Sequence, residues 1–355
     1  MKILVLHSDI GDDAPPEDID TLIAADAVAQ VMSARGHQVG QAPFREETLK
    51  ELLARTMPDI VFNLVEGVDG QGRLAPLAPQ MLADLGMRFT GVSAKAMAVT
   101  NDKPLTKLML REAGLATPGW AVPPDWAGLD GGRWIVKSAL EDASLGLDDG
   151  CVVSGPDVLA RAATCVAKFG GDWFAERYVE GREFNIAVLD GRVLPMAEMC
   201  FQQWPAGKPR IVGYDAKWEE DSSGWRGTVR AFGVERDEPE LAVKLKAACE
   251  QVWKLFALSG FARVDFRVGE DGVPLILEIN TNPCISPDAG FAAAAEAAGM
   301  DYGSLIEAIV NAGPRSDGQE KCEAAGGSEA VFRAAPEAPI NKLGASAPGT
   351  ARPKR

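Results

Sequence analysis

Apolar runs and helical segments alternate through the first third of the chain. Residues 3–6 and 59–65 are apolar runs that predict buried strands, and residue 39 begins a third strand. Between them, residues 18–35 predict a helix that ends at Gly36, because glycine is the usual residue just beyond a helix C-terminus. This alternation predicts a parallel sheet covered by helices.

Beyond Pro118 the apolar runs become shorter. Strands are predicted in the segments R-W-I-V-K-S, W-F-A-E-R-Y-V-E-G-R-E-F-N-I-A-V-L and R-V-L-P-M-A-E-M, with a hairpin turn at Asp190-Gly191. Residues 238–259 predict a long helix, and two helices close the pattern before Gly313. Residues 314–355 are rich in Gly, Ala, Pro, Ser and charge, a composition that predicts a disordered tail.

A second hairpin is predicted around Asp271-Gly272, the dipeptide favoured in two-residue turns. Counting outward from that turn pairs Phe266 with Leu277, Asp265 with Glu278, Val264 with Ile279 and Arg263 with Asn280. Alternation then separates two faces of the hairpin. The apolar face carries Val264, Phe266, Val268, Leu275, Leu277 and Ile279, and the polar face carries Arg263, Asp265, Arg267, Glu278 and Asn280.

The polar face of this hairpin gathers two carboxylates, an amide and a guanidinium at one end. Hard oxygen ligands at this spacing suit magnesium, which proteins hold with one or two carboxylates plus substrate phosphates. A solvated face with a cross-strand Arg–Asp pair explains the same residues. The hairpin alone leaves both interpretations open.

Composition narrows the classes of partner. Hydrophobic residues make up 46% and charged residues 25% of the 355 residues, as in ordinary globular proteins. A net charge of −15 argues against nucleic acid or an anionic membrane as the main partner. The six cysteines have no C-x-x-C spacing, and two histidines are too few for a histidine-based metal site. No apolar run reaches the length of a signal peptide or membrane span, so we expect a cytoplasmic protein.

Several isolated charged residues lie on otherwise apolar segments that precede the hairpin around Asp271-Gly272. Lys137 ends W-I-V-K, Lys103 begins a helix in T-N-D-K-P-L-T-K, and Glu176 and Glu183 flank R-Y-V-E-G-R. Each has an ordinary explanation as a solvated strand end or turn. Together, two lysines can hold phosphates, the E-R-Y-V stretch can offer edge hydrogen bonds to a base, and the carboxylates can hold magnesium on those phosphates.

These motifs, in this order, resemble the ATP-grasp superfamily and, within it, the D-alanine–D-alanine ligases. The resemblance runs from Met1 to about Ala312. It is carried by T-N-D-K-P-L-T-K, W-I-V-K-S, F-A-E-R-Y-V-E-G-R-E-F, Y-D-A-K-W, G-F-A-R-V-D-F and L-E-I-N-T-N-P. It implies an α/β and α+β chain with the ATP-grasp fold and an N-terminal Rossmann-like (pre-ATP-grasp) domain. The expected domains are residues 1–98, a small lobe at 99–175, a C-terminal lobe at 176–313 and the tail.

The resemblance also implies roles for individual residues. The ATP-binding residues are Lys103 and Lys137 for the phosphates, Glu176 and the Val179 backbone for adenine, and Glu183 for ribose. The metal-binding residues, for two magnesium ions that manganese could replace, are Asp265, Glu278 and Asn280. The catalytic residues are Lys217 at the transferred phosphoryl group, Arg263 at the acyl phosphate and tetrahedral intermediate, and Ser144 in the phosphate loop. A homodimer is a further implication.

Departures from the family pattern gather where the amino-acid substrate would bind. The family's glutamate near the N-terminus has no clear counterpart in residues 7–20, where Glu17 or a nearby aspartate could substitute. Asn63 stands near the place of a histidine, Ala143 replaces one of two paired serines, and Trp218 replaces a tyrosine. In C-I-S-P-D-A, Cys284 replaces a glycine and Ala289 a serine, whereas Ser286 and Asp288 could supply new contacts.

The sequence therefore predicts an ADP-forming carboxylate–amine ligase that acts on small amino-acid substrates through an acyl phosphate. Because the substrate-side residues differ, a substrate pair other than two D-alanines competes with D-alanine–D-alanine synthesis. A non-catalytic ATP-binding protein is a second alternative, and it would bind nucleotide without releasing phosphate. The mechanism needs no nucleophilic side chain, which argues against thiol catalysis by Cys284.

Overall fold

The computed structural model describes residues 1–11, 14–219 and 221–313, except for the side chain of Glu17. These residues belong to one compact unit that covers residues 1–316. The predicted disordered tail lies outside the described residues.

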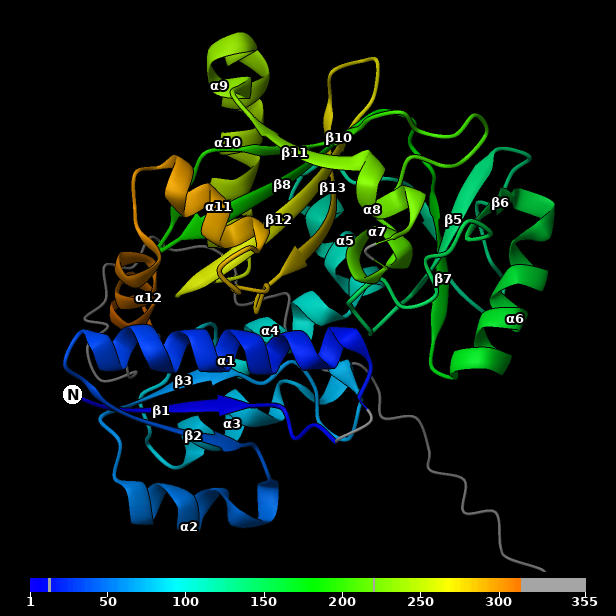
Figure 1. The fold of residues 1–355 in the computed structure, drawn as a ribbon. Helices are drawn as coiled ribbons and strands as arrows, with labels where there is room; N and C mark the ends of the chain where they lie inside the picture. Colours follow the sequence, from blue (N-terminus) through cyan, green and yellow to red (C-terminus); the bar gives the residue numbers. More distant parts are fainter. Residues whose placement is uncertain (12–13, 220, 314–355) are drawn as a thin grey trace, which may run out of the picture. The chain divides into compact units, whose positions relative to one another are not determined.

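The N-terminal region contains the predicted parallel sheet, with strand order β2-β1-β3 (Figure 1). Its strands are β1 (Lys2–His7), β2 (Gln38–Pro43) and β3 (Ile60–Leu64). Its helices are α1 (Pro16–Ala34), α2 (Glu46–Thr56) and α3 (Leu77–Asp84). Gly36 has a φ of +85°, so it ends α1 as predicted. Apolar side chains of β1 and β3 pack against α1 on one face and against α2 and α3 on the other.

A second sheet of four strands has the order β4-β7-β5-β6 and packs against one long helix. Its strands are β4 (Trp120–Ala121), β5 (Arg133–Ser138), β6 (Val152–Ser154) and β7 (Trp173–Arg177), and the helix is α6 (Val158–Phe169). Two helices precede it, α4 (Ala94–Asn101) and α5 (Lys103–Glu112). Asp102 caps α5 through its side chain, and Pro104 lies in the first turn as predicted. Strand β7 straddles the domain boundary predicted at residues 175/176.

The third sheet has the order β11-β10-β8-β12-β13, and β9 pairs with β8. Its strands are β8 (Arg182–Leu189), β9 (Arg192–Val193), β10 (Ala197–Phe201), β11 (Thr228–Phe232), β12 (Phe261–Val268) and β13 (Pro274–Asn280). The helices of this region are α7 (Tyr214–Trp218), α8 (Ser223–Gly227), α9 (Val234–Asp237), α10 (Pro239–Leu255), α11 (Gly290–Ala297) and α12 (Tyr302–Asn311). The predicted Asp190-Gly191 turn joins β8 to β9, with positive φ at both residues.

The β12–β13 hairpin confirms the predicted pairing at its functional end and corrects it near the turn. Asp265 pairs with Glu278 and Arg263 with Asn280, but a bulge follows and Phe266 pairs with Ile276 instead of Leu277. The predicted two-residue turn is wrong, because residues 269–273 form a longer loop. Ile276 is consequently the core residue, whereas Leu277 turns towards a cavity.

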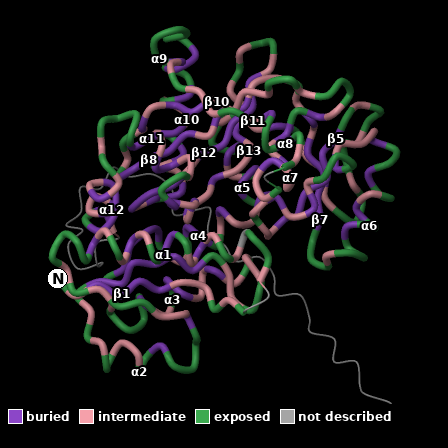
Figure 2. Tube along the Cα trace, viewed as in Figure 1, coloured by how far each residue is buried: buried purple, intermediate pink, exposed green. Residues whose placement is uncertain are grey.

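Two apolar layers cover the large sheet. One contains side chains of α4, α10 and the sheet, and the other joins the sheet to α1, α11 and α12. Figure 2 shows buried segments along β1, β8 and β12, with exposed segments at α2 and α9. This packing fixes the polar face of β12 and β13 relative to α1 and the loop after β3. Within the described ranges, no helix is both long and apolar enough to cross a membrane.

Candidate active site

Two neighbouring cavities meet at the polar face of the β12–β13 hairpin. The larger cavity, about 970 Å³, extends to the N-terminal region, and the smaller, about 70 Å³, lies between β5 and β7 on one side and β12 and β13 on the other. Lys217, Asp265 and Glu278 line both cavities. Of the eleven predicted site residues, Lys103 lines neither, and the others line at least one.

The predicted metal-binding residues are held together by hydrogen bonds. Arg263 donates to both carboxylate oxygens of Asp265, from Nε at 2.7 Å and Nη2 at 2.8 Å. The Asn280 amide lies 3.2 Å from Asp265 Oδ2 and 3.4 Å from Glu278 Oε1. Alternation along the two paired strands turns all four side chains to one face. No group of three or more His, Cys, Asp or Glu residues suited to a metal occurs among the residues described.

Glu278 is the electrostatic centre of the site. Burial opposes its ionisation, but Lys103, Lys137, Lys217 and Arg263 outweigh that cost and hold the pKa of Glu278 well below its usual range. Burial and the neighbouring charge of Arg263 lower the pKa of Lys217. No ion pair or hydrogen bond engages the Lys217 ammonium within the described part of the chain. This excess of positive charge can attract an anionic ligand.

Glu176 joins two lysines beneath the smaller cavity. It is 1% exposed, its Oε1 accepts from Lys137 Nζ at 3.0 Å, and its Oε2 pairs with Lys107 Nζ. Burial raises its pKa, but the two lysines prevail and the net shift is downward. Lys107 is fully buried and also donates to Thr117 Oγ1 at 2.9 Å. The sequence analysis assigned no role to Lys107, although it lies one helical turn after Lys103 in the same motif.

The outer wall of the smaller cavity contains Val179, Glu183 and Leu277. Arg267 Nη2 donates to Glu183 Oε2 at 2.7 Å and to the Arg210 carbonyl at 2.7 Å. Burial raises the pKa of Glu183 despite this pair. Arg267 was placed on the polar face from the sequence, but no function was assigned to it. It holds Glu183 in position at the cavity rim.

The loop of residues 141–146 lies against both cavities. Lys103 Nζ donates to the Glu141 carbonyl at 2.8 Å and to Asp142 Oδ1 at 2.7 Å, so Lys103 is bound to this loop. Ser144 Oγ donates to the Val212 carbonyl at 3.2 Å. Ala143 and Ser144 have φ values of +55° and +63°, a strained conformation for residues with side chains.

In the larger cavity, Asp20 of α1 holds the segment that follows β13. Asp20 Oδ2 accepts from Cys284 Sγ at 2.8 Å, and Oδ1 accepts from Ser286 Oγ at 2.9 Å. Burial and the charge of Asp20 raise the pKa of the Cys284 thiol far above its ordinary range. The protonated thiol supports the argument against thiol catalysis. Ser286 is buried and engaged, whereas Asp288 is exposed and lines the larger cavity.

Near the end of β3, the polar residue that lines the larger cavity is Glu66 and not Asn63. Asn63 is buried and accepts from the Val65 amide at 3.2 Å, so it turns away from the site. The Glu66 side chain lines the larger cavity. Desolvation within the cavity and the negative charge of Asp20 raise its pKa to about 8. Ser8 Oγ accepts from the Glu66 amide at 3.0 Å and fixes the backbone there. The side chain of Glu17, the proposed substitute glutamate, lies outside the described residues.

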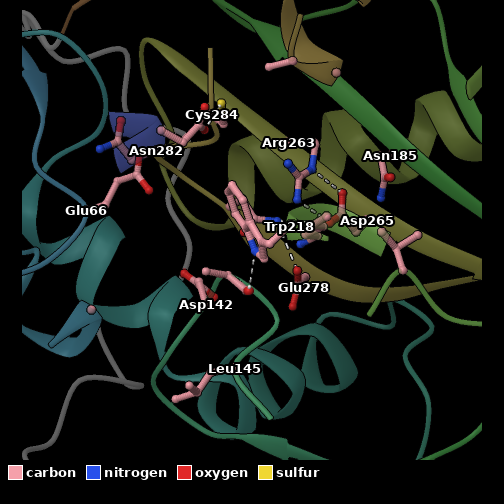
Figure 3. Close-up of a pocket in the computed structure, with 18 of the residues that line it drawn as sticks. Glu66, Asp142, Leu145, Asn185, Trp218, Arg263, Asp265, Glu278, Asn282 and Cys284 are labelled. Carbon is pink, nitrogen blue, oxygen red and sulfur yellow. Dashed lines mark hydrogen bonds and ion pairs between the residues drawn. The ribbon is translucent and has the colours of Figure 1, made fainter. Parts of the chain in front are cut away.

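Figure 3 shows Trp218 between two groups of cavity residues, with Glu66 and Asn282 on one side and Arg263 and Asp265 on the other. Trp218 Nε1 donates to the Ala143 carbonyl at 3.3 Å, which links α7 to the loop of residues 141–146. Trp218 also adds a large apolar surface to the cavity.

Comparison with known proteins agrees with the fold and the order of motifs. Residues 133–311 match the family model described as "D-ala D-ala ligase C-terminus". A D-alanine--D-alanine ligase of Anaeromyxobacter sp. is 31% identical over 293 residues, covering 80% of this chain and 89% of that protein. A Sinorhizobium fredii protein named "Uncharacterized protein y4sG" is 30% identical over 316 residues, covering 85% and 90%.

A solved structure gives the same fold. The D-alanine--D-alanine ligase of Bacillus anthracis complexed with ATP superposes with a TM-score of 0.69 at 20% identity. The match covers 88% of this chain and 97% of that one. The predicted fold class is therefore confirmed. The chain belongs to the D-alanine–D-alanine ligase family of the ATP-grasp superfamily and is a ligase that forms C–N bonds.

Proposed function

We propose that this protein is an ATP- and Mg²⁺-dependent, ADP-forming ligase that joins the carboxylate of one amino acid to the amine of another through an acyl phosphate. The observation that carries the proposal is that Lys137, Lys217 and Arg263 line the same two adjoining cavities as the carboxylates of Asp265 and Glu278. Such an excess of cations beside two carboxylates fits a nucleotide phosphate chain with its metal.

The residues around the smaller cavity fit ATP in character. Lys137 and Lys217 offer ammonium groups for phosphates, and Leu277 and Val179 offer apolar surface for a base. At about 70 Å³ the cavity is far smaller than the roughly 300–1,000 Å³ of typical ligand pockets. Nucleotide binding therefore requires the sheet of β5 and β7 to move away from β12 and β13.

The donor set also fits magnesium. Asp265 and Glu278 supply carboxylate oxygens, and Asn280 supplies an amide oxygen once its amide rotates, because its Nδ2 now donates to both carboxylates. These oxygens are the hard ligands that magnesium prefers. Because these are only three residues, the remaining coordination positions fall to phosphate oxygens and water. When bound, the cation offsets the negative charge that the phosphates carry during transfer.

The chain's own cations then serve the two chemical steps. A donor carboxylate oxygen attacks the terminal phosphorus and ADP leaves, with Lys217 neutralising charge on the transferred phosphoryl group. The acceptor amine attacks the acyl carbon and phosphate leaves, with Arg263 stabilising the negative oxygen of the tetrahedral intermediate. Asp265 orients Arg263 through their two hydrogen bonds. No covalent bond to the enzyme is required.

Between the two candidate substrate pairs, the larger cavity favours one other than two D-alanines. Ser286 is held by Asp20 and Ala289 has no hydroxyl, so neither side chain supplies the polar contact that a family serine would give. Trp218 adds apolar surface in the middle of the cavity. A site with different hydrogen-bonding groups selects different substrates.

The test is phosphate release from MgATP, first with D-alanine alone and then with pairs of D- and L-amino acids, with mass analysis of the products. The proposal predicts ADP, phosphate and an amide in equal amounts for at least one pair. The Asp265→Asn variant serves as the inactive control. ATP binding without phosphate release across the whole panel would contradict the proposal and favour a non-catalytic ATP-binding protein.

A further inference from the structure

The larger cavity contains two arginines that differ in their partners. Arg263 is engaged by both carboxylate oxygens of Asp265. Arg230, on β11, also lines the cavity, but no ion pair or hydrogen bond engages its guanidinium within the described part of the chain. Burial and the charge of Arg263 both act against the Arg230 cation and lower its pKa. A partly buried guanidinium without a counter-ion is stabilised when an anion binds to it.

The backbone beside Arg230 offers a second feature that attracts anions. A Cβ atom at Gly290 would lie 3.4 Å from Arg230 Nη2 and 3.6 Å from Nε, so the guanidinium lies against the first residue of α11. The first N–H groups of a helix have no partner within the helix and carry partial positive charge. At α11 the N-cap residue is Ala289, which makes no side-chain cap, and the first turn has no acidic residue.

The nearest acidic group does not neutralise this arrangement. Asp288 attracts Arg230 through space, but no ion pair or hydrogen bond joins the two side chains among the residues described. Asp288 is exposed. Arg230 therefore keeps its planar fork of N–H donors available, and this fork suits the two oxygens of a carboxylate.

The position in the cavity indicates which carboxylate is bound. In the proposed reaction the donor carboxylate is consumed beside Lys217 and Asp265, where the two cavities meet. Arg230 lines only the larger cavity and lies against α11. The anion that it meets is therefore one that the reaction leaves intact. An amino-acid acceptor keeps its carboxylate after its amine has reacted.

We propose that Arg230, together with the N-terminus of α11, binds the carboxylate that the acceptor substrate retains and so selects acceptors that carry one. This proposal rests on the proposed ligase function. It makes Arg230 a specificity residue, distinct from Arg263, which acts on the reacting atoms.

The kinetic test compares an acceptor with its carboxamide in the wild type and in Arg230→Gln. For D-alanine, or the amino acid that turns over in its place, the variant should raise acceptor KM about 10- to 100-fold. KM for ATP and for the corresponding amide, such as D-alaninamide, should stay within about twofold of wild type. Arg226→Gln, on exposed α8, is the matched control, since Arg226 bonds only the Asp221 carbonyl. Equal losses for acid and amide, or no loss for either, would overturn the proposal.

A binding measurement separates this proposal from the ligase function itself. In protein labelled with ¹⁵N-arginine, sodium acetate is titrated at constant ionic strength against sodium chloride, and the Arg230 Nε–Hε signal is followed. A saturable shift with acetate, absent with chloride, supports the carboxylate site even if no substrate pair turns over. A signal that responds equally to both salts would overturn it, whatever the phosphate-release assay shows.

Discussion

The proposed nucleotide side of the active site, around the smaller cavity, and the proposed substrate side, in the larger cavity, are built differently. Around the smaller cavity, most charged residues stand on strands or on α5 and are paired: Lys107 and Lys137 with Glu176, and Arg267 with Glu183. Where the two cavities meet, Asp265 is paired with Arg263, whereas Lys217 has no ion-pair partner within the described ranges. On the substrate side, residues such as Glu66, Asp288 and Arg230 come from loops and an edge strand, and Arg230 has no ion-pair partner within the described ranges.

This difference corresponds to two tasks: phosphoryl transfer, which is the same for every substrate pair, and acceptor binding, which differs between substrates. Phosphoryl transfer needs the same cations and carboxylates whatever the acceptor, so rigid, mutually paired side chains suit it. The proposed acceptor site takes its residues from loops and an edge strand, and loops change more readily than the elements that they connect. The account predicts that changes on the nucleotide side abolish turnover or stability, whereas changes on the substrate side alter which substrate is used.

The largest expected effect on turnover is from Asp265→Asn. It removes a proposed metal ligand and releases Arg263, and we expect kcat to fall about 10²- to 10³-fold, the usual loss for one electrostatic group in a transition state. Asp271→Asn, in the loop of the same hairpin, is the control and should leave kcat unchanged. Full activity in Asp265→Asn would mean that the hairpin is only a solvated Arg–Asp face.

The largest expected effect on stability is from Glu176→Gln. It leaves the buried Lys107 without its counter-ion, and the free energy of unfolding should fall by about 3–5 kcal/mol in urea titrations. Glu180→Gln breaks an exposed pair with Arg133 and should cost less than about 1 kcal/mol. Similar losses in both variants would show that Glu176 is not the structural centre of the nucleotide side.

A smaller effect should distinguish the two residues at the hairpin bulge. Ile276→Ala opens a cavity in the core and should cost about 2–5 kcal/mol of stability. Leu277→Ala should cost clearly less stability but raise KM for ATP, because Leu277 lines the smaller cavity. Denaturation and ATP kinetics on both variants check this, and a reversed order would contradict the bulge.

How far the sequence predicts this site can be judged from the same hairpin. Strand alternation and the opposed pairs Arg263–Asn280 and Asp265–Glu278 were predictable, because one register alone separates polar from apolar residues. The bulge was not, since Ile276 and Leu277 are adjacent apolar residues and only tertiary packing decides which one enters the core. Glu66 and Arg230 stand on segments whose approach depends on packing across the whole unit, and no local pattern marks them.

The smallest expected effect concerns pH. Because the pKa of Glu66 is raised to about 8 from an ordinary value near 4.5, the folded protein holds this proton more tightly than the unfolded chain. The contribution of Glu66 to stability is therefore lost as pH rises between these values and is constant above about 8. The Tm advantage of Glu66→Gln over wild type should grow across that window. A Tm difference that does not change with pH would contradict the raised pKa of Glu66.

The most direct test of the central claim follows oxygen atoms. A donor amino acid labelled with ¹⁸O in its carboxylate is incubated with MgATP, an acceptor that turns over and the enzyme, and the released phosphate is analysed by mass spectrometry. Activation as an acyl phosphate predicts one ¹⁸O atom from the donor in each phosphate released. Unlabelled phosphate accompanying amide formation would contradict the account.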